Sequence, residues 1–564
     1  MLAWRMHKDA KTVTAPLANA APPPIPDTNR PRNADDHADG NRARRKLKIG
    51  ILDLVHKGPT TALWARLMHA NLASFMPQAL AVWCEEAGHE VTFAVYTGLE
   101  NVESMLPDDV DLVLIGAFTQ AAQLSYALSN MYRKRGAVTV LGGPHARCYP
   151  EDAARYFDYV LGFTDKETLD QVLREAAPHR PMGVCISAKK QPTYLPSLEQ
   201  RWKFVAPTLR KAISPIKMVP MLGSLGCPYT CSFCIDSEIE YQPFEFSRVG
   251  DDLRFLVKTM PGVWVAWHDP NFGVRFDEML AEIDSAVPRG KLSFAAESSL
   301  SLLSEPRLKR LKDAGFVAML PGVESWFSLG NKSKTGGRQG LEKVEQVSDH
   351  INMIMRYIPY VQANFVLGLD VDAGDEPFEL TKRFLRRTPG VFPGYSLMSA
   401  FGEAAPLNLE LQRAGRVLPF PFHFLNNNEA MNVKPKNYEW VEFYDRIIDL
   451  VGYSFSPGTM ARRVKANWGS FAWWGNIVRG ISSEGYGRLH YHSRIRGLLK
   501  TDATMRDFFE GATDVIPGFY RDRVREELGP LWQHLPEGAL DHDPTAYLKK
   551  SDARCETVVR ARAA

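Results

Sequence analysis

The sequence predicts an α/β protein with three folded regions: a doubly wound parallel sheet, a partial or complete parallel (β/α) barrel, and a mainly helical C-terminal region. Three observations predict this order. Short apolar runs alternate with helical patterns from Lys48 onward, a second such series starts near residue 216, and strand patterns fade after about residue 435. A length of 564 residues suits three to four domains of about 150 residues each.

The overall composition is that of an ordinary globular protein, with 45% hydrophobic and 24% charged residues. A formal net charge of +3 is too small to indicate nucleic acid or an anionic membrane as the main partner. Seven cysteines in 564 residues do not make a disulfide framework, which favours a reducing compartment. We find neither a run of about 18 apolar residues nor the apolar core of a secretory signal. We therefore expect a cytoplasmic protein with no transmembrane segment and no nucleic-acid partner.

Residues 1–46 are rich in Ala, Pro and polar residues and predict a disordered tail. The tail ends in a basic cluster that either binds an acidic partner or is a solvent-exposed run of charged residues. The cluster comprises Arg42, Arg44, Arg45 and Lys46.

Residues 47–180 predict the doubly wound domain, because strand-like runs alternate with segments that place apolar residues at helical spacing. Such sheets hold ligands at the carboxyl ends of their strands. The loops after Leu54, Phe118 and Gly143 should therefore lie together, and the domain is a candidate cofactor holder. The strand-like runs are 48–54, 90–98, 111–118, 137–143 and 159–163.

Residues 181–215 show no steady period and predict a linker, and residues 216–435 predict the barrel. The chemistry of a barrel lies at the carboxyl ends of its strands. Residues 436–564 predict a helical domain without a recognisable motif. The strand-like runs of the barrel are 218–224, 263–269, 291–298, 316–325 and 360–370.

The strongest motif is a triad of cysteines, Cys227, Cys231 and Cys234, directly after the first barrel strand. Chance spacing of this kind has an expectation of roughly 0.001 in such a chain. Three thiolates select an iron–sulfur cluster or zinc. A structural zinc needs a fourth ligand, and the nearest other cysteine is Cys185. A cluster with three protein ligands leaves one iron open to another molecule. The remaining cysteines have no mutual spacing and are interpreted as buried or incidental thiols: Cys84, Cys148, Cys185 and Cys555.

This triad, placed after the first strand of a parallel barrel, resembles the cysteine motif of the radical S-adenosylmethionine superfamily. The resemblance implies a 4Fe-4S cluster whose open iron binds S-adenosyl-L-methionine. An electron from the reduced cluster then breaks the sulfonium bond and gives a 5′-deoxyadenosyl radical, while the barrel orients the reactants and keeps water away.

Two strand-end carboxylates are candidate contacts for S-adenosylmethionine at the barrel mouth. By resemblance, Glu324 in the segment that contains Gly322 suits the ribose hydroxyls or the amino group, and Glu297 ends the preceding strand. The alternative for each residue is a structural carboxylate at a strand end that does not contact the ligand. Phe233 either covers the adenine or packs as an ordinary aromatic. Residues 364–370 resemble the strand whose backbone flanks the adenine, or are simply a buried strand.

Two further segments resemble members of the superfamily that carry a cobalamin domain. Residues 268–273, with Asp269, resemble an Asp-x-Asn-Phe segment of those members, although they also suit a turn. The Rossmann-like first domain resembles their cobalamin-binding domain, in which small residues at a strand end let the backbone approach the nucleotide tail of the cofactor. Turn geometry alone would explain the same glycines. The residues that carry this second resemblance are Gly142, Gly143, Pro144 and His145.

The loop after the first strand departs from cobalamin domains that supply a histidine ligand. Those domains carry Asp-x-His-x-x-Gly, whereas this loop has Asp53, His56 and Gly58 at a different spacing. We therefore expect His56 to be a loop residue and not a cobalt ligand.

The resemblance implies a cobalamin-dependent radical S-adenosylmethionine enzyme that methylates an unactivated carbon of a small molecule or lipid. Its cofactors would be a 4Fe-4S cluster, S-adenosyl-L-methionine and cobalamin, with an external electron donor such as flavodoxin or ferredoxin. The alternative is a ring-forming or rearranging radical enzyme without methyl transfer. A third hypothesis is a non-catalytic cobalamin or redox sensor, against which the intact Glu324 and 364–370 segments speak.

Overall fold

The first folded region is a six-stranded parallel sheet with the order β2-β1-β3-β4-β5-β6. The computed structural model describes residues 45–175, 182–188, 190–192, 194–237 and 239–546, so the predicted tail before Arg45 and Cys555 lie outside the described residues. The strands are β1 (Lys48–Leu54), β2 (Glu90–Tyr96), β3 (Leu112–Ala117), β4 (Val138–Gly142), β5 (Tyr159–Leu161) and β6 (Val184–Ile186).

Helices cover both faces of this sheet, as a doubly wound topology requires. Alternate residues of β1 show the two sides: Ile51 packs in one apolar core with α2 and α6, and Leu52 packs in another with α3. The strand order reverses between β1 and β3, which is the switch point at which such sheets bind ligands. The helices are α1 (Leu63–Met68), α2 (Phe75–Glu86), α3 (Ala122–Lys134), α4 (Pro144–Cys148), α5 (Pro150–Ala153) and α6 (Lys166–Glu175).

The predicted linker at 181–215 is more ordered than expected, because it contains both β6 and α7 (Leu198–Lys211). The helix begins with a capping box in which Ser197 and Gln200 exchange side-chain and backbone hydrogen bonds. Pro207 inside the helix obscures its period in the sequence. Three residues are also too few for β6 to show a strand pattern of its own.

The second sheet is an open, six-stranded parallel sheet with the order β14-β13-β12-β11-β10-β7, a partial barrel. The first five of its strands along the chain match the predicted runs, whereas β14 was not predicted because Pro393 and Gly394 interrupt its pattern. The strands are β7 (Met218–Met221), β10 (Trp264–Trp267), β11 (Ser293–Ser299), β12 (Phe316–Glu324), β13 (Tyr360–Leu367) and β14 (Phe392–Leu397). The helices include α8 (Phe246–Thr259), α9 (Phe276–Ala286), α10 (Glu305–Ala314), α12 (Gly340–Met355), α13 (Glu376–Arg387) and α14 (Pro406–Arg413).

The C-terminal region is helical, as predicted. Phe471, just before α17, packs against Trp264 and Tyr360 with ring centroids 5.0 and 6.4 Å away, so this region closes the barrel where its strands begin. None of the helices in the described part of the chain is both long and apolar enough to cross a membrane. The helices are α15 (Trp440–Ser454), α16 (Pro457–Ala466), α17 (Ala472–Ile481), α18 (Tyr486–Thr501), α19 (Ala503–Phe509) and α20 (Gly518–Leu528).

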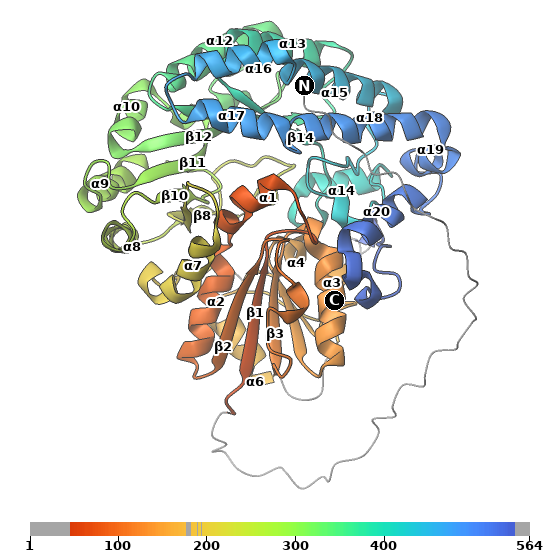
Figure 1. Ribbon diagram of the computed structural model, residues 1–564. Coiled ribbons are helices and arrows are strands. Elements are labelled where there is room, and N and C mark those ends of the chain that lie inside the picture. Colours follow the sequence, from red (N-terminus) through yellow and green to blue (C-terminus); the bar gives the residue numbers. More distant parts are fainter. Residues whose placement is uncertain (1–44, 176–181, 189, 193, 238, 547–564) are drawn as a thin grey trace, which may run out of the picture. The chain divides into compact units, whose positions relative to one another are not determined.

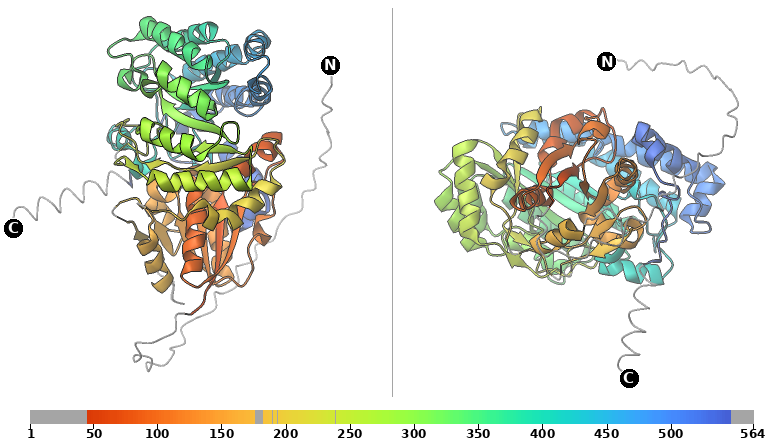
Figure 2. Two further views of the ribbon diagram at one scale, coloured as in Figure 1. Left: turned by 90° about the vertical axis from the view of Figure 1, so that its left-hand side faces the viewer. Right: turned by 90° about the horizontal axis from the view of Figure 1, so that it is seen from below.

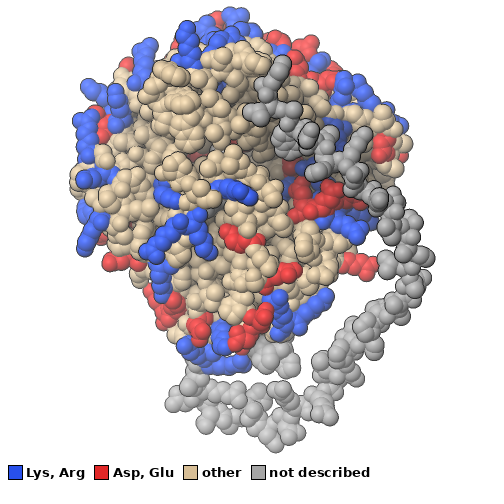
Figure 3. Space-filling model, viewed as in Figure 1, with Lys and Arg blue, Asp and Glu red and all other residues tan. Residues whose placement is uncertain are grey.

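From Lys46 onward the chain clusters as one compact unit. Within it, the strands of the first sheet, in red and orange, point their carboxyl ends toward the green and teal barrel (Figure 1). Figure 2 shows the same two layers from the side and from below. On the face drawn in Figure 3, acidic and basic side chains are interspersed, which agrees with the nearly balanced charge of the sequence.

Candidate functional site

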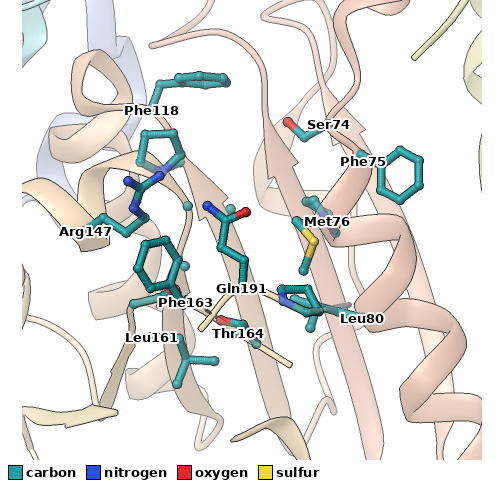
Figure 4. Close-up of a pocket in the computed structure, with 18 of the residues that line it drawn as sticks. Ser74, Phe75, Met76, Leu80, Phe118, Arg147, Leu161, Phe163, Thr164 and Gln191 are labelled. Carbon is teal, nitrogen blue, oxygen red and sulfur yellow. Dashed lines mark hydrogen bonds between the residues drawn. The ribbon is translucent and has the colours of Figure 1, made fainter. Parts of the chain in front are cut away.

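A cavity opens at the carboxyl ends of the first sheet, at its switch point. Its floor is the apolar face of the sheet, with Leu114, Val140 and Leu161. The amino end of α2 forms one wall, and the loops after β4 and β5 form the opposite wall, with Met76 and Leu80 facing Arg147 and Phe163 across the space (Figure 4). The barrel supplies the remaining wall through Leu222, Leu225, Gly226, Asp236, His268 and Pro270.

The predicted glycine pair lines this cavity. Gly143 has φ +95°, and a Cβ there would lie 2.9 Å from the carbonyl oxygen of Ala117, so only glycine fits without strain. No atom lies within 4 Å of the position of a Cβ on Gly142, so a side chain there would extend into open space. Pro144 lines the cavity as well. The sheet edge therefore offers a bare backbone cradle, which fits a large cofactor that must approach closely.

His145 does not lie with these residues. Its side chain is fully buried, and its Nε2 lies 2.6 Å from the hydroxyl oxygen of Tyr126, which also donates to Asp152 at 2.6 Å. Burial lowers the pKa of His145 to about 3, so the ring is neutral. Because α4 turns at Pro144, the next side chain points into the core instead of the cavity.

The wall formed by α2 is anchored by Asp53 at the end of β1. Its carboxylate accepts hydrogen bonds from the backbone N–H of Ser74 at 2.6 Å and from the Ser74 hydroxyl at 2.8 Å. Burial raises the pKa of Asp53 to about 6. These bonds fix the first residue before α2, so the wall keeps its place beside the sheet.

His56 lies in the loop after β1 and does not line the cavity, in agreement with its predicted role. Its Nδ1 lies 2.6 Å from the carbonyl oxygen of Gly58. The same loop is fastened by Lys57, whose ammonium pairs with Glu429 at 2.7 Å and with Glu527 at 3.1 Å. The loop therefore joins the first domain to the end of the barrel region, through Glu429, and to the C-terminal region, through Glu527.

The cysteine triad lies on a folded loop between β8 (Ser224–Leu225) and β9 (Gln242–Pro243), which pair antiparallel. Gly226 has φ +69°, and a Cβ on it would collide with the carbonyl oxygen of Glu240. The backbone N–H of Cys227 donates to the carbonyl oxygen of Ile239 at 3.3 Å, and the backbone N–H of Cys234 donates to the carbonyl oxygen of Cys231 at 2.9 Å. The loop thus holds its three thiols in place through its own backbone.

The donor set of the triad fits an iron–sulfur cluster. In the described part of the chain, no group of three His, Cys, Asp or Glu side chains is arranged around a single metal position. A 4Fe-4S cluster can take three thiolates that each bind a different iron, and this loop supplies three thiols. Burial raises the pKa of the Cys231 thiol and raises the pKa of the Cys234 thiol to about 11. Bound iron would supply the positive charge that favours the thiolate forms.

Asp269 lies beneath the cysteine loop, with both of its oxygens engaged. It accepts hydrogen bonds from the backbone N–H of Gly223 at 2.9 Å and from the hydroxyl of Ser224 at 2.6 Å. Asn271 accepts in turn from the backbone N–H of Ser299 at 2.8 Å. The segment 268–273 therefore joins the ends of β7, β10 and β11 and positions the start of the cysteine loop.

Glu324 ends β12 beside the triad. It has φ +66°, and the register of β12 against β13 shifts at this point, so the backbone turns the carboxylate away from the strand direction. The carboxylate pairs with Lys332 at 2.6 Å. The side chains of Glu324 and Lys332 fill the space where a Cβ on Gly322 would lie. Lys332 also attracts negative charge on Cys231 and Cys234, so the pair and the triad form one cluster of charges.

Glu297 and His268 face the hollow of the barrel. Each side chain is accessible to water and yet surrounded by protein, and the resulting desolvation raises the pKa of Glu297 and lowers that of His268. Phe233 is partly buried against the apolar core. After β13, Gly368 has φ +89°, and a Cβ on it would lie 2.9 Å from the side chains of Met431 and Phe443. The structure therefore brings Glu297, Gly322, Glu324 and the three cysteines to one mouth.

Three residues of this site were not predicted from the sequence: Arg147, Lys332 and Lys343. Lys343 is buried in α12 and donates to the carbonyl oxygens of Ser325 and Ser328, both at 2.6 Å, so it holds the loop that follows Glu324. Burial lowers the pKa of Lys343 to about 8. No local pattern marks these cations, since their partners lie 8 to 89 residues away in the chain.

Comparisons with known proteins agree with this arrangement, although no family model matches the chain. The chain is 22% identical over 304 residues to bacteriochlorophyllide d C-8(2)-methyltransferase of Chlorobaculum tepidum, covering 52% of this chain and 66%, just under two thirds, of that protein. It is 20% identical over 389 residues to bacteriochlorophyllide d C-12(1)-methyltransferase of the same organism, covering 67% of this chain and 83% of that protein.

Among solved structures, the cobalamin-dependent S-adenosylmethionine radical enzyme OxsB matches with a TM-score of 0.51 and 11% identity, covering 91% of this chain and 81% of that chain. The chain therefore shares the fold of this solved enzyme. The predicted fold class is confirmed, and the fold agrees with the predicted resemblance to this branch of the superfamily. The relatives are enzymes by name, which supports the prediction of an enzyme.

Proposed function

We propose that this chain is a cobalamin-dependent radical S-adenosylmethionine enzyme that methylates an unactivated carbon of a small molecule. The observation that carries the proposal is that the cavity of the first domain is lined on its barrel side by Gly226 and Asp236, which flank the cysteine triad. A holder for one cofactor thus opens directly onto the loop for the other. Both sequence relatives carry the names of methyltransferases.

The residues of the chain divide between the cofactors. Gly142, Gly143 and Pro144, with the apolar floor, would hold cobalamin, and Cys227, Cys231 and Cys234 would hold the 4Fe-4S cluster. Glu324 and Lys332 would bind the amino and carboxylate groups of S-adenosylmethionine, because they present one negative and one positive charge beside the triad. The bound groups would supply a radical that removes a substrate hydrogen and a methyl group that replaces it.

The chain's own residues would enclose the substrate between these two sites. His268 lines the cavity from the barrel side, and Glu297 faces the barrel hollow. Both side chains are therefore placed to contact substrate groups next to the reacting carbon. The apolar floor and walls exclude water, which protects a radical from side reactions. A neutral His268 and a carboxyl group in a desolvated hollow suit a ligand with a few polar groups on an apolar body.

The wider setting follows from this chemistry. We expect an external one-electron donor such as flavodoxin or ferredoxin, and a small molecule or lipid as substrate. The cluster requires a reducing compartment, so we expect the cytoplasm.

Anaerobic reconstitution with iron, sulfide, cobalamin and S-adenosylmethionine, followed by reduction and chromatography of the nucleosides, tests the proposal. We expect 5′-deoxyadenosine together with S-adenosylhomocysteine, the latter only when cobalamin is present. 5′-Deoxyadenosine alone would favour a ring-forming or rearranging enzyme, and neither product would favour a sensor.

The matched variants are Cys231→Ala and Cys185→Ala. Cys185 is an exposed thiol outside the triad, so its loss should leave iron content and both products unchanged. Loss of Cys231 should abolish cluster assembly and both activities. Retained iron and turnover in Cys231→Ala would refute the cluster assignment.

A further inference from the structure

Arg147 joins the first domain to the cysteine loop. It lies on α4, three residues after Pro144, and its Nη2 donates to the carbonyl oxygen of Ile235 at 2.9 Å. Its Nη1 pairs with the carboxylate of Asp236 at 3.3 Å. Ile235 and Asp236 directly follow Cys234, so one side chain of the cobalamin-type domain grips the end of the cluster loop.

The guanidinium of Arg147 is held on its other side by an aromatic ring. It lies over Phe163, in the loop after β5, with 4.7 Å to the ring centroid. Figure 4 shows the two side chains together on one wall of the cavity. The side chain of Arg147 is only 19% exposed, so its charge is weakly screened by water.

The gripped segment contacts the sulfur of the last cysteine. The backbone N–H of Asp236 donates to Sγ of Cys234 at 3.4 Å. The carboxylate of the same residue repels negative charge on Cys234. Arg147 thus holds the donor in place and neutralises the neighbouring negative charge.

Both effects bear on electron uptake by a cluster at this triad. The reduced cluster carries one more negative charge than the oxidised cluster. Hydrogen bonds to the cysteine sulfurs and nearby positive charge stabilise the reduced form and raise the reduction potential. An uncompensated carboxylate would do the opposite.

We propose that Arg147 is a positioning residue that raises the reduction potential of the cluster by fixing the Ile235–Asp236 segment against Cys234 and by neutralising Asp236. The proposal rests on the cluster part of the proposed function and is independent of methyl transfer and of bound cobalamin. It makes electron entry depend on the docking of the first domain on the cysteine loop.

The test is a redox titration of the full-length protein, followed by electron paramagnetic resonance, after reconstitution with iron and sulfide alone. Arg147→Met removes the planar guanidinium group with its N–H donors and removes the positive charge. We expect a lower midpoint potential. At a fixed potential, the ratio of reduced to oxidised cluster should fall about tenfold, which corresponds to a shift of about 59 mV for a one-electron couple. Arg147→Lys keeps a charge without the planar fork and should give a smaller downward shift.

Arg155→Met is the matched control. Arg155 also pairs with an aspartate, Asp152 at 2.8 Å, and lies over a ring, that of Tyr156 at 4.9 Å. Its other partners are the carbonyl oxygens of Gly538 and Asp541, on the C-terminal region. This variant should leave the potential unchanged, and an equal shift in Arg147→Met and Arg155→Met would overturn the proposal.

Asp236→Asn tests the charge part of the proposal and should give a shift of opposite sign. It removes the negative charge but keeps the backbone N–H and Arg147, so we expect a higher potential. This variant also decides the matter if Arg147→Met assembles no cluster, since an unchanged or lowered potential in Asp236→Asn would overturn the proposal. Equal potentials in the wild type and Arg147→Met would overturn it as well. Failure of the wild type itself to assemble a cluster would refute the cluster assignment.

Discussion

Glu324 and Lys332 form an ion pair, with Nζ 2.6 Å from Oε1, at the point where β12 ends beside the cysteine loop. Glu324 adopts a positive φ of 66°, which costs an L-residue about 1 kcal/mol or more and is typical of functional sites. Burial of the pair leaves Glu324 11% and Lys332 22% exposed. The strand end therefore presents two opposite charges in a fixed orientation toward the triad.

Lys332→Met should weaken binding of S-adenosylmethionine at least tenfold without loss of the cluster. The change removes the positive charge that would meet the carboxylate of the ligand, and one charge-assisted hydrogen bond contributes about 1.5 to 3 kcal/mol. Equilibrium dialysis under anaerobic conditions measures the affinity, and iron analysis measures the cluster. Lys334→Met, an exposed change on the same loop, is the control. Equal affinities of all three proteins would show that Lys332 does not contact the ligand.

Gly142→Leu should prevent cobalamin binding and leave the fold intact. The new side chain would extend into the cavity from a position with no neighbour within 4 Å, so it displaces a ligand and not protein atoms. Absorption spectroscopy after gel filtration measures bound cobalamin, and circular dichroism measures the fold. Gly497→Leu, in α18 and likewise without a neighbour within 4 Å, is the control and should bind as the wild type does. Full cobalamin binding by Gly142→Leu would place the cofactor elsewhere.

Asp53→Asn should change how stability depends on pH. Burial raises the pKa of Asp53 from its ordinary 3.8 to about 6 in the folded chain, so the folded chain holds the proton more tightly than the unfolded chain. The resulting stabilisation is complete below the unfolded pKa and is lost as pH rises through about 6, by at most about 3 kcal/mol. Asparagine does not ionise, so the variant should gain stability relative to the wild type from pH 5 to pH 7.

Thermal unfolding of the cofactor-free protein at several pH values measures this difference. Asp514→Asn, an exposed change in the C-terminal region, should follow the wild type throughout. A difference between Asp53→Asn and the wild type that does not vary with pH would show that Asp53 does not titrate in this window.

The parts of the site that could be predicted from the sequence are those with a local signature. The spacing of Cys227, Cys231 and Cys234 and the glycine pair at the end of β4 are such signatures, because each depends on residues a few positions apart. Arg147 was missed because its partner Asp236 lies about 90 residues away in the chain, and this pair forms only when the two sheets are in place. Lys332 was missed because its pair with Glu324 spans eight residues at a strand end, and its effect on Cys231 depends on the folded barrel.

His145 shows a different limit of sequence reasoning. It directly follows three cavity residues, and yet it packs against Tyr126 in the core, since one step along a short helix turns the side chain by about 100°. β14 and α7 were missed because Pro393, Gly394 and Pro207 interrupt patterns that tertiary packing restores. Proline and glycine mark turns in the sequence but do not prevent regular structure where neighbours supply the contacts.

Lys57→Met should destabilise the contact between the first domain and the C-terminal region. Lys57 is the shared cation of Glu429 and Glu527, at 2.7 and 3.1 Å, and its side chain is only 11% exposed. Removal of Lys57 leaves the partly buried Glu429 without its ion-pair partner, whereas Glu527 keeps Arg523 at 2.8 Å. We expect a cost of about 2 kcal/mol, which lowers a thermal midpoint by a few degrees. Lys48→Met breaks only an exposed pair with Asp109, so it should leave the midpoint unchanged. In the double variant Lys57→Met and Glu429→Gln, the uncompensated charge of Glu429 is gone, so part of the lost stability should return. Equal midpoints for Lys57→Met and Lys48→Met would mean that this buried cluster does not hold the two regions together.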